Sequence, residues 1–197
     1  MDLKLTGKVA LVTGSSRGIG LATAKAFAAE GCRVMLSGRS TEQLRQAETA
    51  LRATGAQVAA HAGDVGSPDQ ASRLIEATVA AYGGIDILVN NVGGGGGGAR
   101  IADSTDDDWR GALERNLIQT VRMMRLALPH MKDRSGAAMI NDLRLVAAAR
   151  DVRPIRRGQG RADFRHRALG AGIRAVWHPL DQWIRARQFG RRCAAPR

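Results

Sequence analysis

The segment TGSSRGIG, residues 13–20, constrains the fold of this chain more than any other segment. It follows the apolar run KVALVT (8–13), typical of a strand buried on both faces, and precedes LATAKAFAAEG (21–31), which has a helical pattern. The glycines permit a tight turn and leave the backbone open to close approach. Because free N–H groups at a helix start bind anions, the segment predicts a turn that binds the pyrophosphate of a dinucleotide.

Apolar runs and helical patterns alternate from this turn to residue 141. Further strands are expected at 33–38, 56–65, 85–91 and 137–141, and further helices at 41–55, 67–84 and 105–132. Strands that alternate with helices pair in parallel through right-handed crossovers. The sequence therefore predicts an α/β fold over residues 1–141, a Rossmann-like doubly wound parallel sheet that is truncated after its fifth strand.

Residues 142–197 show neither pattern, and we expect an irregular, disordered tail there. The tail carries 14 Arg, no Lys and 4 Asp, so it supplies +10 of the chain's formal net charge of +12. Such a charge could bind nucleic acid or an acidic partner, which would make the chain a non-catalytic dinucleotide-binding module. The tail has no recognisable nucleic-acid motif and no helical patterning, so we do not expect nucleic acid as the partner.

A set of motifs resembles the short-chain dehydrogenase/reductase family. TGSSRGIG, the pair Asp64-Val65, the segment NNVG (90–93) and Asn116 occur in the family's order, and the resemblance covers residues 5–141. It implies a single Rossmann-type domain that binds NAD(P). It also implies hydride transfer between the nicotinamide and a small-molecule carbonyl or secondary alcohol.

The resemblance also assigns roles to residues. Gly14, Gly18 and Gly20 would shape the phosphate loop and Ser15 and Ser16 would line it. Asp64 would bind the adenine amino group, Val65 would pack against the ring, and Asn91 and Gly93 would lie beside the adenine ribose. Asn116 would hold a water of the proton relay, and Asn90 would brace the central strands. The complete predicted cofactor-binding set is Gly14, Ser15, Ser16, Arg17, Gly18, Ile19, Gly20, Arg39, Asp64, Val65, Asn91 and Gly93.

The end of the second expected strand indicates which dinucleotide is preferred. An acid there would bind the ribose 2′-hydroxyl and repel a 2′-phosphate, but the sequence reads Ser37-Gly38-Arg39. Arg17 and Arg39 could each bind a 2′-phosphate through a guanidinium. We therefore expect NADP(H) to be preferred over NAD(H). No cluster of residues with metal-ligand spacing is present, and Cys32 and Cys193 are isolated.

The family's acid/base residues are missing. Its reaction uses a tyrosine, a lysine four positions later that lowers the tyrosine's pKa, and a serine after the fifth strand. Here the only tyrosine is Tyr82, the last lysine is Lys132, and AAMIN (137–141) runs into DLRLV. Asn116 alone remains of the catalytic set, and it cannot act as the acid or base. We therefore expect the chain to be inactive unless a histidine replaces the tyrosine; the candidates by residue type are His61, His130, His166 and His178.

A shift of reading frame explains what is missing. Read one base later, RPIRRGQGRADF (153–164) can encode V-P-Y-A-A-A-K-A-G-L-T, which contains the Tyr-x-x-x-Lys element. In the same frame NDLRLVAAARD (141–151) can encode T-S-V-S-S, and VWHPLDQWIRA (176–186) can encode Y-G-I-R-S-I-N-G-Y-A-P, which resembles a later strand of the family. We infer a frameshift near Asn141–Asp142.

Location and assembly are expectations of the same kind. No run of 18 apolar residues and no signal-peptide pattern occurs, so we expect a cytoplasmic protein without a membrane span. Members of the family form dimers or tetramers through the long helix and the helix that follows it. Because the sequence of residues 142–197 shows no pattern of such a second helix, this assembly is not carried over to the present chain.

Overall fold

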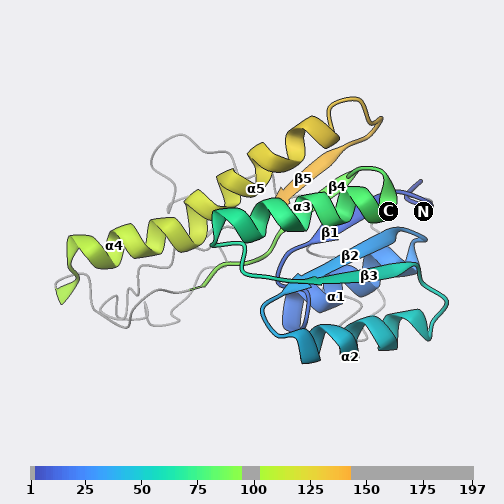
Figure 1. Ribbon diagram of the computed structural model, residues 1–197, viewed down its shortest axis with the longest axis horizontal. Coiled ribbons are helices and arrows are strands. Elements are labelled where there is room, and N and C mark those ends of the chain that lie inside the picture. The colour runs from blue at the N-terminus through green and yellow to red at the C-terminus, as the bar shows by residue number, and fades with distance from the viewer. Residues whose placement is uncertain (1–2, 95–102, 143–197) are drawn as a thin grey trace, which may run out of the picture. The chain divides into compact units, whose positions relative to one another are not determined.

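In the computed structural model, which describes residues 3–94 and 103–142, five strands form one parallel sheet (Figure 1). They are β1 (Val9–Val12), β2 (Arg33–Gly38), β3 (Val58–Ala62), β4 (Ile87–Asn90) and β5 (Ala138–Asn141). The order across the sheet is β3-β2-β1-β4-β5, and every neighbouring pair is parallel. This confirms the predicted Rossmann-like, doubly wound sheet.

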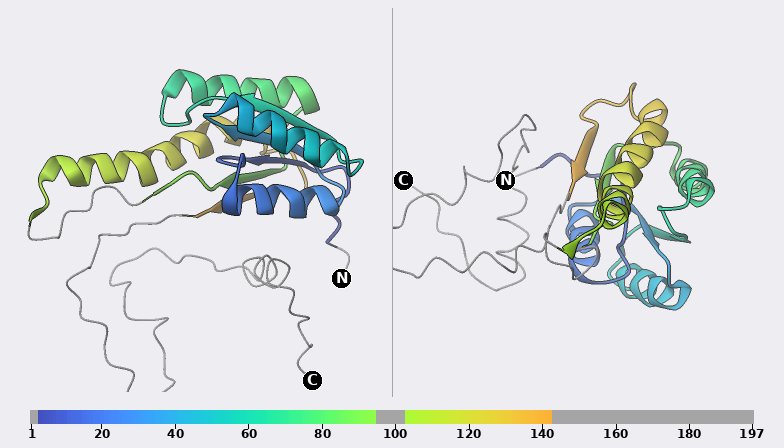
Figure 2. Two further views of the ribbon diagram at one scale, coloured as in Figure 1. Left: turned by 90° about the horizontal axis from the view of Figure 1, so that it is seen from below. Right: turned by 90° about the vertical axis from the view of Figure 1, so that its left-hand side faces the viewer.

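Helices cover both faces of the sheet (Figure 2). Helices α1 (Gly18–Ala29) and α2 (Thr41–Arg52) lie on one face, and α3 (Pro68–Tyr82) and α5 (Gln119–Ala127) lie on the other. The central strand β1 is therefore fully buried along its whole length. Burial on both faces is the physical reason for its unbroken run of apolar residues.

The helix expected over 105–132 consists of four segments. It begins as α4 (Asp106–Leu113), passes through a π-helical turn η2 (Glu114–Ile118), continues as α5 and ends in the 3₁₀ turn η3 (Leu128–His130). Thr105 caps its start: the hydroxyl accepts a bond from the Asp108 N–H, and the Asp108 carboxylate accepts one from the Thr105 N–H. The π turn could not be read from the sequence, because its apolar spacing is that of an ordinary helix.

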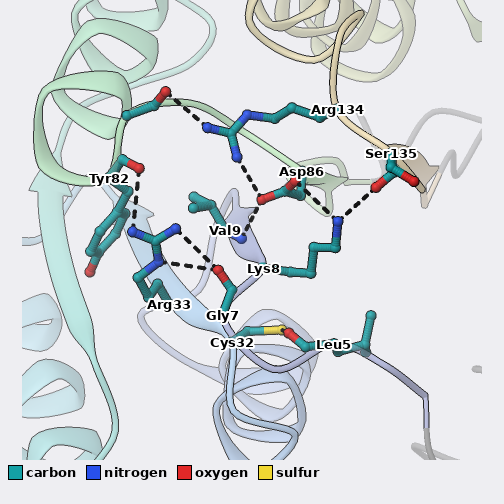
Figure 3. Close-up of polar contacts among 11 residues, drawn as sticks. Leu5, Gly7, Lys8, Val9, Cys32, Arg33, Tyr82, Asp86, Arg134 and Ser135 are labelled. Atoms are coloured by element: carbon teal, nitrogen blue, oxygen red, sulfur yellow. Dashed lines mark hydrogen bonds and ion pairs between the residues drawn. The ribbon is translucent and has the colours of Figure 1, made fainter.

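A buried carboxylate holds the amino edge of the sheet together (Figure 3). Asp86, just before β4, accepts hydrogen bonds from the Val9 backbone N–H at 2.8 Å and from the Arg134 guanidinium at 3.0 Å. The Lys8 ammonium lies 3.6 Å from its other oxygen. Asp86 thus joins β1, β4 and the turn before β5 through charged and hydrogen-bonded partners.

The only tyrosine also lies at this amino edge. The Tyr82 hydroxyl donates to the Val34 carbonyl at 3.2 Å. The Arg33 guanidinium stacks 5.7 Å from the Tyr82 ring centre (Figure 3). Burial raises the pKa of Tyr82. Tyr82 therefore fastens the end of α3 to the start of β2, which is the opposite edge from the glycine turn.

Two kinds of site do not occur in the described part of the chain. No helix among residues 3–94 and 103–142 is long and apolar enough to cross a membrane. The same residues contain no group of three His, Cys, Asp or Glu side chains that could bind a metal ion. The predicted frameshift segment, His166, His178 and Cys193 lie outside the described residues.

Candidate dinucleotide site at the carboxyl edge of the sheet

The predicted cofactor residues all follow the carboxyl ends of strands. Residues 13–17 follow β1, Arg39 follows β2, residues 63–66 follow β3 and residues 91–94 follow β4. From β1 the chain winds outward to β2 and β3 and then returns to β4 on the other side of β1. Crevices at such a switch point are where open α/β sheets bind nucleotides.

The turn after β1 requires glycine for its backbone conformation and for close packing. Gly14 and Gly18 have φ angles of +63° and +59°, in the left-handed region that favours glycine. At Gly20, in the first turn of α1, a Cβ would collide with the Gly14 carbonyl and the Asn91 amide. Close packing therefore requires glycine at 14 and 20, whereas Gly18 faces open space and is favoured by its φ angle.

The start of α1 presents free N–H groups. Its N-cap, Arg17, makes no side-chain capping bond, and no acid occurs in the first turn. The N–H groups of Gly18, Ile19 and Gly20 are therefore available to an anion, and the helix dipole favours negative charge there. The side chains of Arg17 and Ile19 are exposed beside them.

The two serines of the turn have different environments. Ser15 is fully buried: its hydroxyl donates to the Val12 carbonyl at 2.7 Å and accepts from the Ser37 N–H at 2.9 Å. Its side chain thus ties the end of β1 to β2, which differs from the expectation that Ser15 lines the phosphate loop. Ser16 is only partly buried, and its hydroxyl lies 3.4 Å from the Gln43 side-chain oxygen of α2.

Asn91 joins the loops after β1 and β4. Its amide donates to the carbonyls of Thr13 at 3.0 Å and Gly14 at 3.2 Å, and its N–H donates to the Thr13 hydroxyl at 2.9 Å. The side chain expected beside the ribose therefore also fixes the glycine turn. Asn90, expected to brace the central strands, donates to the Asn141 side chain on β5 at 2.9 Å.

Asn116 lies in the π turn and binds the loop after β4. Its side-chain oxygen accepts from the Gly94 N–H at 3.0 Å, and its amide donates to the Gly94 carbonyl at 3.1 Å and to the Ala112 carbonyl at 2.8 Å. The Thr120 hydroxyl donates to the main-chain carbonyl of Asn116 at 2.9 Å. Gly93 leaves room for this contact, because a Cβ there would lie 2.9 Å from the Asn116 oxygen.

Asp64 and Val65 form the turn between β3 and α3. One Asp64 carboxylate oxygen accepts from the Gly66 N–H at 2.9 Å, and the Asp64 N–H donates to the Gln70 side chain at 2.7 Å. Val65 is buried in the core between the sheet and α3, alongside Leu74. Val65 thus anchors a turn whose acid lies at the carboxyl edge.

Two arginines lie at this edge of the sheet, near the end of β2 and the start of α1. Arg39 follows β2 and Arg17 precedes α1, and both side chains are exposed. Between them Gly38 lies close to Ser16, because a Cβ at Gly38 would be 3.2 Å from the Ser16 hydroxyl oxygen. The end of β2 is thus next to the glycine turn, and the residues there carry no negative charge.

Some residues of this edge were missed by the sequence reasoning. Thr13, Gln119 and Arg122 each bind a loop of the site: Gln119 donates to the Val92 carbonyl at 3.0 Å, and Arg122 donates to the Gly66 carbonyl at 2.9 Å. Gln119 and Thr120 occupy buried positions of a helix where apolar residues are expected. Polar residues on the core-facing side of a helix were the available signal.

The comparisons with known proteins agree on one family. The family model for short chain dehydrogenases matches residues 8–142. An uncharacterized oxidoreductase of Bacillus subtilis, YvrD, is 37% identical over 155 residues, which are 79% of this chain and 56% of that protein. The chain thus spans about half the length of the curated relatives it matches, with 53% of a Cupriavidus necator D-beta-hydroxybutyrate dehydrogenase and 49% of a Sus scrofa dehydrogenase/reductase.

Solved structures show the same likeness. L-sorbose reductase from Gluconobacter frateurii, complexed with NADPH and L-sorbose, is 38% identical with a TM-score of 0.66, over 71% of this chain and 53% of that one. An NADPH-bound short chain oxidoreductase from Pseudomonas aeruginosa, described as containing an atypical catalytic center, is 37% identical with a TM-score of 0.63. That match covers 67% of this chain and 52% of the other.

Proposed function

The chain belongs to the short chain dehydrogenase family, and we propose that residues 1–141 are its NADP(H)-binding domain. The glycine turn carries the proposal: a Cβ at Gly18 would meet no atom within 4 Å, and Gly14 and Gly20 let the turn pack closely before the uncapped start of α1, where a pyrophosphate would bind. When bound, the dinucleotide supplies a hydride for a carbonyl or accepts one from a secondary alcohol. That reaction on a small molecule is the activity we propose for the parent enzyme.

Different residues of the carboxyl edge would bind different parts of the dinucleotide. The N–H groups at Gly18–Gly20 would bind the pyrophosphate, and Asp64 would accept a hydrogen bond from the adenine amino group. Asn91 and Gly93 would border the adenine ribose. Asn91 supports this assignment by its bonds to Thr13 and Gly14, which hold the two loops together.

The preference for NADP(H) over NAD(H) rests on charge at the end of β2. The residues there are Ser37, Gly38 and Arg39, so no carboxylate would repel a 2′-phosphate. Arg39 and Arg17 are both exposed and next to this strand end. NADPH in the related structures is consistent with the choice.

We further propose that the chain as written has no turnover. The family's Tyr-x-x-x-Lys element does not occur in the sequence, and Tyr82 lies at the amino edge, where its hydroxyl binds Val34. We attribute this to a frameshift near Asn141–Asp142, with residues 142–197 read out of frame. A cytoplasmic location is part of the same proposal.

Binding and turnover separate the parts of this proposal. Titration of the full chain with NADPH and NADH, followed by cofactor fluorescence, should show saturable binding that is tighter for NADPH. Incubation of NADPH with a panel of ketones and aldehydes should show no loss of absorbance at the nicotinamide band. Equal affinity for both cofactors would overturn the NADP(H) preference, and steady oxidation of NADPH would overturn the proposed inactivity.

A further inference from the structure

The turn from Asp64 to Gly66 is held by the Asp64 N–H, which donates to the Gln70 side chain at 2.7 Å, and by the buried Val65. Asp64 binds the Gly66 N–H through one carboxylate oxygen, and its carbonyl accepts from the Ser67 N–H at 3.0 Å. The second carboxylate oxygen accepts no hydrogen bond within the described residues. These hydrogen bonds all lie within residues 64–70, so the position of the Gly66 end of the turn, and with it the direction of the free oxygen, also depends on what contacts the Gly66 carbonyl from another element.

Arg122, which lies much later in the chain, contacts this turn. It projects from α5, and its guanidinium donates to the Gly66 carbonyl at 2.9 Å and to the Glu114 carboxylate at 2.8 Å. Only 14% of its side chain is exposed. A largely buried guanidinium bound to an acid on one side and a carbonyl on the other has a fixed position.

Gln119 reinforces the same contact. Its side-chain oxygen lies 3.6 Å from the place that a Gly66 Cβ would occupy, and its amide donates to the Val92 carbonyl after β4. The helix segment from Glu114 to Arg122 therefore touches the turn after β3 and the loop after β4 together. This segment includes the π turn, which brings Asn116 to Gly94.

We propose that Arg122 is a positioning residue for adenine recognition. By fixing the Gly66 carbonyl it orients the Asp64 turn, so that the free carboxylate oxygen faces the adenine amino group. The inference rests on the proposed NADP(H) site, in which Asp64 binds that amino group. Arg122 itself touches no part of the dinucleotide.

The test compares NADPH with its hypoxanthine analogue, which carries an oxygen in place of the amino group. Affinities are measured by cofactor fluorescence on the full 197-residue chain, without substitution and with Arg122→Leu. A hydrogen bond to a charged group discriminates by about tenfold or more. We expect the unsubstituted chain to prefer NADPH over the analogue by about tenfold. Arg122→Leu should lose most of that preference, while its affinity for the analogue stays unchanged.

Two further variants keep the test sharp. Arg125→Leu, on the exposed side of the same helix, should retain the full preference. Arg122→Lys can still donate to the Gly66 carbonyl and should retain part of it. If Arg122→Leu does not fold, as judged by circular dichroism, the comparison of Arg122→Lys with Arg125→Leu decides the question.

The outcomes distinguish this inference from the function on which it rests. Equal weakening of both ligands by Arg122→Leu would overturn the positioning role, because the change would then be a general loss of the site. No effect on either ligand would overturn it as well. Absence of NADPH binding by the unsubstituted chain would overturn the proposed function, and this inference with it.

Discussion

At the scale of single residues, exposed arginines and buried polar groups have separate tasks. Arg39 is exposed after β2 and free to meet a ligand, whereas Arg122 is bound to Gly66 and Glu114. Ser15 is buried and holds β1 to β2. Residue type alone does not tell these tasks apart, because burial and partners decide which polar groups remain available.

Arg39→Ala should weaken NADPH binding by about tenfold and leave NADH binding unchanged, because a charge-assisted bond to the 2′-phosphate is lost. Cofactor fluorescence measures both affinities. Arg45→Ala, which removes an exposed arginine from α2, is the matched control and should change neither. An equal loss for NADH would show that Arg39 does not bind the 2′-phosphate.

Because the pKa of the Cys32 thiol is raised in the folded state, we expect the free energy of unfolding to depend on pH. Burial raises its pKa from 9.0 to about 11, and the nearby charges of Glu30 and Asp86 add to the effect. The folded state therefore holds the thiol proton more tightly than the unfolded state. The contribution of Cys32 should be complete below pH 9 and should be lost as the pH rises through about 11.

Urea unfolding between pH 8 and 11 measures this contribution in a Cys193→Ser background. The free energy of unfolding should fall more steeply for the chain with Cys32 than for Cys32→Ala. Other groups that titrate in this range, such as Tyr82 and the lysines, act on both chains and cancel in the comparison. Parallel declines would contradict the role given to Cys32.

At the scale of elements, the glycine turn lies at the carboxyl edge of the sheet, and Asp86 with its partners Val9, Lys8 and Arg134 lies at the amino edge. Gly20→Ala should weaken NADPH binding by at least about tenfold, because the added Cβ would push α1 away from the Gly14 carbonyl and misplace the N–H groups. Gly111→Ala in α4 is the control, since the Arg115 side chain facing it can move aside. Unchanged binding by Gly20→Ala would exclude a pyrophosphate at this turn.

Removal of the Asp86 carboxylate should destabilise the fold without acting on the site. Asp86→Ala leaves the Val9 N–H and the Arg134 guanidinium without their acceptor, and we expect a loss of about 3 kcal/mol in the free energy of unfolding. Asp133→Ala, one position before Arg134 and exposed, should cost far less. Equal unfolding midpoints of the two variants in urea would contradict the stabilising role given to Asp86.

At the scale of the whole molecule, the proposed frameshift near Asn141–Asp142 would separate the dinucleotide-binding residues from the family's Tyr-x-x-x-Lys element. Sequencing source DNA across codons 135 to 165 tests the frameshift directly. A single-base difference should restore the Tyr-x-x-x-Lys element, and the chain expressed from that gene should oxidise NADPH with a carbonyl substrate. The chain as written should bind NADPH without turnover; confirmation of its sequence in source DNA would leave a natural pseudo-enzyme or a gene fragment.

Local patterns were sufficient to predict the fold class and the glycine turn. A strand, a turn and a helix follow one another along the chain, so the apolar run at 8–13 and the glycines at 14, 18 and 20 indicate their own conformation. The π turn at Glu114–Ile118 was not predicted, because it changes the backbone hydrogen bonds without changing the apolar pattern. The second helix begins at Thr41, as predicted, and its side-chain cap is Ser40, whose hydroxyl accepts from the Gln43 N–H.

Contacts between distant segments were decided only by the tertiary structure. Asp86 meets Val9 and Arg134, Asn91 meets Gly14, and Arg122 meets Gly66, across 48 to 77 positions of sequence. Each of these bonds forms because parallel strands carry their ends to a common edge, where residues from separate βα units become neighbours. Sequence spacing predicts the strands and helices themselves, but the partner of a side chain depends on strand order, register and helix packing, which exist only once the sheet has assembled.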